Sequence, residues 1–115
     1  MILITQTFKK LLSKIKSVSL LDIQVEIFKH DKWLENFIEI WEIEWRKILK
    51  WYLLQKKVRL IVLFQEKNGK YMPFYIVKKE TKHGKNISKD SIYFLSWKLD
   101  SIFNDLENWA YEILD

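Results

Sequence analysis

The sequence predicts an α+β fold in one domain that spans all 115 residues, and three features carry this prediction. Two runs rich in β-branched and aromatic residues, 58–65 and 71–79, flank the dipeptide Asn68-Gly69, the strongest short hairpin signal. Apolar residues of helical spacing lie on both sides of this hairpin. We therefore expect a β-hairpin, or a three-stranded antiparallel sheet, packed with two long helices and a short N-terminal basic helix.

The N-terminal segment, residues 5–18, predicts the short basic helix. Its apolar stripe consists of Phe8, Leu11, Leu12 and Ile15, and its lysines are Lys9, Lys10, Lys14 and Lys16. The next segment fits two structures. Ser19 and Asp22 have the spacing of a capping box, which indicates a helix start, whereas Ile23, Val25 and Ile27 alternate as in a strand. We favour a third strand over residues 22–28.

A long helix is predicted over residues 32–55, with Asp31 as its N-cap and Glu35 in the first turn, where the helix dipole favours an acid. Its apolar residues fall into two stripes: Leu34, Phe37, Trp41, Trp45, Ile48 and Tyr52 form one, and Trp33, Ile40, Ile43, Trp51 and Leu54 form the other. A helix that is apolar on two sides must be covered on two sides.

The hairpin register follows from a two-residue type I′ turn at Asn68-Gly69. This turn pairs Leu63 with Phe74 and Ile61 with Ile76 on one face, and Phe64 with Pro73 and Val62 with Tyr75 on the other. Both faces are apolar, so the hairpin has to be sandwiched between other elements. Proline cannot donate to a strand ladder, and Pro73 therefore predicts an edge strand.

The last predicted helix begins after a cap at Ser88 or Asp90 and ends near Leu114. Its apolar seam consists of Ile92, Leu95, Leu99, Ile102, Leu106, Trp109 and Ile113, which alternate spacings of three and four as in paired helices. The seam, the two-sided helix and the two-faced hairpin together leave more apolar surface than one chain of this length covers. A homodimer is therefore predicted.

Charge is strongly segregated along the chain. Residues 45–89 contain 13 Lys or Arg against two acids, whereas residues 22–44 hold seven acids against two lysines and residues 90–115 six against one. The net charge of +5 hides a middle block near 13 − 2 = +11. A local field of this size attracts a polyanion or an acidic partner.

The predicted hairpin gathers much of this charge at its open end, and it suggests a nucleic-acid-binding site. The candidate residues are Lys56, Lys57, Arg59, Lys78, Lys79, Lys82, His83, Lys85 and Lys89. Lysines neutralise phosphates without reading bases, and the chain has only two arginines, so we expect DNA or RNA binding with little sequence specificity. The same lysines also fit an ordinary solubilising surface that protects a strand edge.

Two other functions remain open. The 18 aromatic residues suit a protein-interaction module, such as a small inhibitor or assembly factor that has an acidic partner. The motif Glu80-Thr81-Lys82 has the spacing found in many metal-dependent nucleases, which makes a nuclease the remote alternative. His30 and His83 are far apart, so no metal, cofactor or catalytic residue is predicted. The absence of cysteine and of a long apolar run fits an intracellular, cytoplasmic protein.

Overall fold

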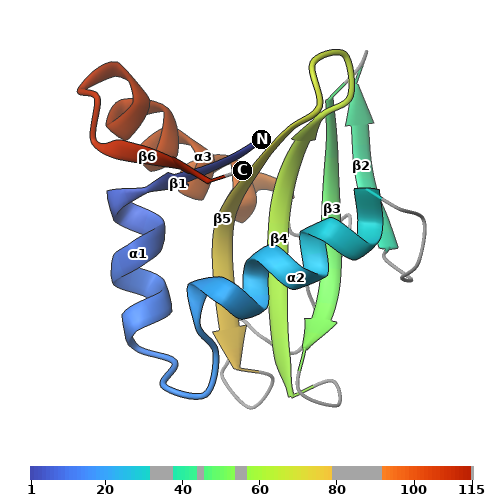
Figure 1. Cartoon of the computed structure of the whole chain (residues 1–115). Helices are drawn as coiled ribbons and strands as arrows, with labels where there is room; N and C mark the ends of the chain where they lie inside the picture. Colours follow the sequence, from blue (N-terminus) through green and yellow to red (C-terminus); the bar gives the residue numbers. More distant parts are fainter. Residues whose placement is uncertain (32–37, 44–45, 54–56, 79–91, 115) are drawn as a thin grey trace.

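The computed structural model describes residues 1–31, 38–43, 46–53, 57–78 and 92–114 (Figure 1). In chain order the elements are β1 (Ile2–Thr5), α1 (Gln6–Ser13), α2 (Leu20–Asp31), β2 (Ile38–Ile43), β3 (Arg46–Leu53), β4 (Val58–Gln65), β5 (Lys70–Lys78), α3 (Ile92–Glu107) and β6 (Tyr111–Leu114). The strands form one mixed sheet in the order β2-β3-β4-β5-β1-β6. The α+β class is confirmed, but the sheet has six strands where at most three were predicted.

The long helix predicted over residues 32–55 is wrong, because β2 and β3 lie within this segment and pair antiparallel, with Ile43 opposite Arg46. An apolar pattern on two sides also fits a strand that is buried on both faces. Ile48 and Leu49, adjacent residues of β3 that point to opposite faces, are both fully buried. The alternation of Ile and Glu in β2 is a strand pattern that would have predicted the correct structure here.

The strand favoured for residues 22–28 is also wrong, because this segment belongs to α2. The capping box predicted the structure correctly. The Asp22 carboxylate accepts from the Ser19 amide at 2.8 Å, and the Ser19 hydroxyl accepts from the Asp22 amide at 3.3 Å. Ile23 and Ile27, one helical turn apart, are buried, while Val25 between them is exposed.

The short basic helix is confirmed as α1, where Phe8 and Leu12 are buried, but it ends at Ser13 and not near residue 18. Its N-cap is Thr5, whose Oγ1 accepts from the Phe8 amide at 3.2 Å. The backbone amide of Thr7, in the first turn of α1, donates to Asp105 Oδ2 of α3 at 2.7 Å. The two helices are therefore joined at the N-terminus of α1.

The β4–β5 hairpin is confirmed, but its predicted register is wrong. Gln65 lies opposite Lys70, so the turn has four residues between the strands in place of two. Gly69 has a φ of 64°, whereas among the described residues the only other positive φ belongs to Trp109, and a type I′ turn would require one at Asn68.

The two additional turn residues shift all pairs of the hairpin. Leu63 lies opposite Met72 and Phe64 opposite Tyr71, and the register shifts again between Ile61 and Val62.

The edge position predicted from Pro73 is wrong, because β5 lies between β4 and β1. Pro73 is opposite Val62 at the register shift, and a bulge is one of the few places where a sheet accepts proline. On its other side β5 pairs with β1 in parallel at Tyr71, two residues before the proline.

The last helix ends at Glu107, and the chain then turns into β6, which pairs antiparallel with β1. The helical seam is confirmed for Leu95 and Ile102, which are fully buried. It is wrong for Trp109 and Ile113, whose exposed fractions are 80% and 51%.

Helices cover both faces of the sheet. Figure 1 shows α2 crossing in front of β3, β4 and β5, with α3 behind the sheet. Directly opposite residues of an antiparallel pair share a face, so Tyr75 and Ile61 lie on the same side. Lys98 of α3 places its Nζ 5.4 Å from the Tyr75 ring centroid, which identifies this side as the α3 face. The other side is called the α2 face.

Candidate nucleic-acid interface

Three of the nine candidate residues, Lys57, Arg59 and Lys78, lie in the described part of the chain. The other six lie outside the described residues: Lys56, Lys79, Lys82, His83, Lys85 and Lys89. Glu80 of the nuclease motif also lies outside them.

The register places Lys57, Arg59 and Lys78 at the open end of the hairpin. Val58 is opposite Lys78, Arg59 is opposite Val77, and Lys57 immediately precedes β4. Lys78 shares the α2 face with Val58, whereas Arg59 points to the α3 face. Lys57 and Lys78 are exposed and Arg59 is 7% exposed. The three cations therefore meet at one end of the hairpin, but Lys78 and Arg59 lie on different faces.

Strand β3 adds two residues that the sequence analysis missed. Tyr52 is directly opposite Arg59, and Lys50 lies two positions earlier on the same face. The Arg59 Cζ and the Lys50 Nζ are each 5.4 Å from the Tyr52 ring centroid. We call Lys50, Tyr52 and Arg59 the cationic cluster. Its cations hold the positions over an aromatic ring that favour a cation–π interaction.

The cluster changes the acidity of the tyrosine at its centre. Burial opposes ionisation of Tyr52, but the hydrogen bond and charge of Lys50, and then the charge and hydrogen bond of Arg59, outweigh it. The pKa of Tyr52 is lowered as a result. The lowered pKa of Tyr52 indicates that the electrostatic potential at this position stabilises negative charge.

Arg59 carries hydrogen-bond donors that are buried and unused. Among the described residues, its Nε and Nη1 have no acceptor. A buried donor without an acceptor costs about 1 to 3 kcal/mol, and more when it is charged. Each of these donors can be satisfied by an oxygen of a carboxylate or a phosphate, the anions that a guanidinium commonly binds. Arg59 therefore has the chemistry of an anion-binding residue.

At the turn end of the same strands, one lysine is paired with two acids. Lys47 of β3 lies 3.7 Å from Glu39 and 3.6 Å from Glu66, measured between the Nζ and a carboxylate oxygen. None of the ion pairs found between described residues involves Lys57 or Arg59. Among the described residues, a lysine at the turn end thus has acidic partners, whereas Lys57 and Arg59 at the open end have none.

The described residues contain no group of three His, Cys, Asp or Glu side chains that fits a metal ion. None of the three described helices combines the length and apolar character that a membrane span requires.

The cationic cluster was missed because its spacing was assigned to a helix. In a helix, Lys50 and Tyr52 lie on different sides, whereas in a strand residues two apart share a face. Assignment of residues 46–53 as a strand next to 58–65 would have brought both residues beside Arg59. Comparison with family models, with curated proteins and with solved structures finds no match, so the residues of this chain carry the functional argument alone.

Proposed function

We propose that this protein is a non-enzymatic binding module that holds the phosphate backbone of a nucleic acid, with little sequence specificity. The observation that carries the proposal is the buried guanidinium of Arg59, whose Nε and Nη1 find no acceptor in the part of the chain that the structure describes. A phosphate group offers the oxygens that these donors need. Lys50 on the same face and Lys57 beside the strand add positive charge around the position that the phosphate would occupy.

A polyanion suits the site better than a single small anion, for reasons of charge distribution. Lys57 and Lys78 are exposed at the strand ends, while Arg59 and Lys50 lie deeper, at 7% and 9% exposed. A chain of phosphates can contact the exposed lysines and the deeper cluster at the same time. Low specificity follows from the chemistry, because phosphate contacts position a nucleic acid without reading its sequence.

The salt dependence of binding tests the proposal. Affinity for a short RNA or DNA should fall steeply between about 50 and 200 mM salt, because each neutralised phosphate releases counterions. Arg59→Met should weaken binding and reduce the slope of log K against log salt by about one. Lys57→Ala should have a similar effect on the slope. Lys70→Ala, which removes a lysine at the turn end of the same hairpin, is the matched control and should leave the slope unchanged.

Fold integrity must be separated from loss of contact. Arg59→Lys retains the charge but replaces the several donors of the planar guanidinium with one ammonium group, so it should bind less tightly than the wild type and more tightly than Arg59→Met. Circular dichroism and thermal unfolding of both variants show whether the sheet is intact. Salt-insensitive binding, or unchanged affinity in a folded Arg59→Met variant, would contradict the proposal.

The nuclease alternative makes a different prediction for the same samples. It requires shortened nucleic acid on a denaturing gel after addition of a divalent metal, and loss of these products in Glu80→Ala. The binding proposal expects intact probe under both conditions.

A further inference from the structure

The α3 face holds a further cation beside the cationic cluster. Ile61 of β4 lies opposite Lys50 of β3 on one side and opposite Tyr75 of β5 on the other, so these three residues form one row across the sheet. Arg59, two positions before Ile61, is a diagonal neighbour of both ends of this row. Lys98 of α3 places its Nζ 5.4 Å from the centroid of the Tyr75 ring. Positive charge from β3, β4 and α3 therefore gathers on one face of the sheet.

The cationic cluster lies deeper than the lysines around it. Arg59 and Lys50 are 7% and 9% exposed, whereas Lys57 and Lys78 at the strand ends are exposed. The buried Nε and Nη1 of Arg59 find no acceptor among the described residues. An anion that satisfies these donors must therefore reach below the level of the exposed lysines.

The phosphates of a nucleic acid differ in how far they can reach below a protein surface. An internal phosphate diester has a nucleoside on both sides, so its neighbours must follow it into a recess. A phosphate monoester at the end of a strand is attached on one side only, and its three acceptor oxygens project beyond the last sugar. A recessed guanidinium therefore favours a terminal phosphate over an internal one.

Charge favours the same group. A phosphate monoester carries a charge of about −1.5 to −2 at neutral pH, whereas each internal phosphate carries a single negative charge. Lys50 and Arg59 provide two positive charges at diagonal positions of one face. Buried charges are stabilised only by close partners of opposite charge, and the monoester supplies more negative charge for these two cations than the diester does.

Two tyrosines of the α3 face show where the positive potential is concentrated. Burial opposes ionisation of Tyr52, but the hydrogen bonds and charges of Lys50 and Arg59 outweigh it and lower its pKa. Burial raises the pKa of Tyr75, although Lys98 stands over its ring. The position that stabilises an anion is therefore beside Tyr52 and Arg59, and Lys98 lies at its margin.

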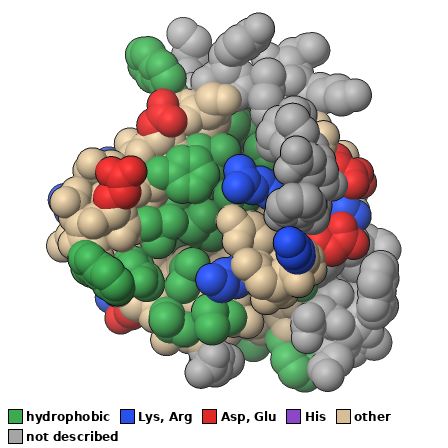
Figure 2. All heavy atoms as spheres, turned by 90° about the horizontal axis from the view of Figure 1, so that it is seen from above, with side chains coloured by type: hydrophobic (Ala, Val, Ile, Leu, Met, Phe, Trp, Pro, Cys, Tyr) green, Lys and Arg blue, Asp and Glu red, His purple; other side chains and the backbone are tan. Residues whose placement is uncertain are grey.

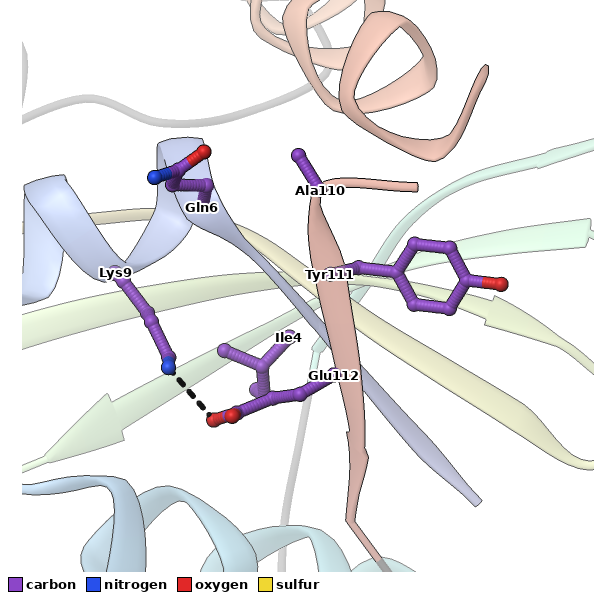
Figure 3. Close-up of a pocket in the computed structure, with 6 residues that line it drawn as sticks. All are labelled: Ile4, Gln6, Lys9, Ala110, Tyr111 and Glu112. Carbon is purple, nitrogen blue, oxygen red and sulfur yellow. Dashed lines mark ion pairs between the residues drawn. The ribbon is translucent and has the colours of Figure 1, made fainter. Parts of the chain in front are cut away.

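Two lysines elsewhere in the described part of the chain already have acidic partners. In the pocket between α1 and β6, Lys9 and Glu112 turn toward each other, with their charged atoms 2.9 Å apart (Figure 3). At the turn end of the hairpin, Lys47 pairs with Glu39 and Glu66. Figure 2 looks onto this end and shows acidic and basic side chains next to one another on its right-hand side. A phosphate at either lysine would compete with a carboxylate that is already present.

We propose that the cationic cluster binds the terminal phosphate monoester of a nucleic-acid strand, an inference that rests on the backbone binding proposed above. The terminal phosphate accepts hydrogen bonds from the guanidinium of Arg59, while the phosphate diesters that follow it lie along the exposed Lys57 and Lys78. Arg59 thus selects the end of a strand. The exposed lysines supply affinity that does not depend on the end.

The test compares three single-stranded probes of about ten nucleotides with the same sequence, made in DNA and in RNA. One has a 5′-phosphate, one a 3′-phosphate and one a hydroxyl at both ends. A phosphorylated probe should bind the full chain about tenfold more tightly than the hydroxyl probe, because a charge-assisted hydrogen bond is worth at least this factor. The tighter of the two phosphorylated probes identifies which end is bound. Inorganic phosphate at constant ionic strength should weaken binding of that probe and leave the hydroxyl probe unaffected.

Variants of Arg59 assign the preference to the cluster. Arg59→Met should bring the affinities for the phosphorylated and hydroxyl probes to within about twofold, and Arg59→Lys should retain part of the preference. Lys9→Ala, which removes a lysine that is paired with Glu112, is the matched control and should keep the full preference. Thermal unfolding shows whether each variant is folded, and the competition by inorganic phosphate uses the wild type alone.

The outcomes separate this inference from the backbone binding on which it rests. Equal affinity for the three probes, with a steep dependence on salt, would overturn the selection of a strand end and leave backbone binding in place. Absence of salt-dependent binding would overturn both. A preference for the phosphorylated probe that persists in a folded Arg59→Met variant would also overturn the inference, because another residue would then hold the terminal phosphate.

Discussion

Arg59 lies directly opposite Tyr52 across the β3–β4 pair, with its Cζ 5.4 Å from the centroid of the tyrosine ring. Lys50 approaches the same ring to the same distance. The tyrosine ring is therefore within cation–π distance of two cations on one face of the sheet. This arrangement exists only because residues 46–53 form a strand. It places the buried guanidinium of Arg59 on the same face as Lys50 of the neighbouring strand, so their positive charges add.

The first prediction concerns the ionisation of Tyr52. Lys50→Met should raise the pKa of Tyr52, because it removes the hydrogen bond and the charge that oppose the effect of burial. The pKa is read from the ring ¹³C shifts of labelled tyrosines during a pH titration, with Tyr52→Phe to identify the signal. An unchanged Tyr52 titration in Lys50→Met would contradict the proposed geometry of the cluster.

The lowered pKa also predicts how stability depends on pH. The folded state releases the Tyr52 proton at a lower pH than the unfolded state, where the pKa is about 10. Ionisation therefore adds stability as the pH rises from the folded pKa toward the unfolded one, and this contribution is absent below the folded pKa. The difference in unfolding free energy between the wild type and Tyr52→Phe should grow over this alkaline range and stay constant near neutral pH.

Local signals in the sequence indicated the parts of the fold that depend on neighbouring residues, although a strand was favoured over the helix that the capping box indicated. The capping box at Ser19 and Asp22, the basic helix α1 and the Asn68-Gly69 reversal each depend on contacts within a few residues. The segment 32–55 failed because its apolar residues satisfy helical spacing and also fit strands buried on both faces. Whether this segment forms a helix or strands depends on its pairing with β4, which the periodicity of the segment does not reveal. The cationic cluster was missed for the same reason.

The second prediction concerns Gly69 in the hairpin turn. A Cβ at this position meets open space, so the cost of Gly69→Ala comes from the φ of 64° alone. Unfolding by urea should show a loss of about 1 kcal/mol. Gly69→Asn should lose less, because asparagine tolerates the left-handed region. Asn68→Ala is the control and should stay within about 0.5 kcal/mol of the wild type, since its φ is not positive. Equal losses at the two positions would argue against the four-residue turn.

The third prediction concerns Thr5, the N-cap of α1. Thr5 is fully buried and its Oγ1 accepts from the Phe8 amide. Thr5→Ala should reduce the free energy of unfolding by about 1 to 2 kcal/mol, because this amide loses its acceptor. Thr5→Ser retains the hydroxyl and should recover most of the loss, as measured by urea unfolding. A serine variant as unstable as the alanine variant would assign the effect to the packing of the Thr5 methyl group.

The last prediction concerns Lys47, which pairs with Glu39 of β2 and Glu66 of the hairpin turn. Burial lowers the pKa of Lys47, but the charges of Glu39, Glu66 and Glu42 and a hydrogen bond to Glu66 outweigh it, so the pKa is raised. A raised folded pKa stabilises the fold fully below the unfolded pKa of about 10.4, and this contribution is lost as the pH rises through the folded value. The side chains are partly exposed, at 26%, 38% and 54% for Lys47, Glu39 and Glu66, so the pairs contribute at most about 1 kcal/mol.

Lys47→Met tests this contribution because methionine retains much of the apolar stem while removing the charge. Its unfolding free energy should lie below that of the wild type near neutral pH, and the difference should shrink as the pH rises through the folded pKa and as salt screens the pairs. Tyrosine ionisation in the same range affects both proteins and cancels in the comparison. A difference that is the same at neutral and alkaline pH would mean that Lys47 stabilises the sheet through its stem alone, and the turn end of the hairpin would then have no electrostatic part in joining β2 to β3.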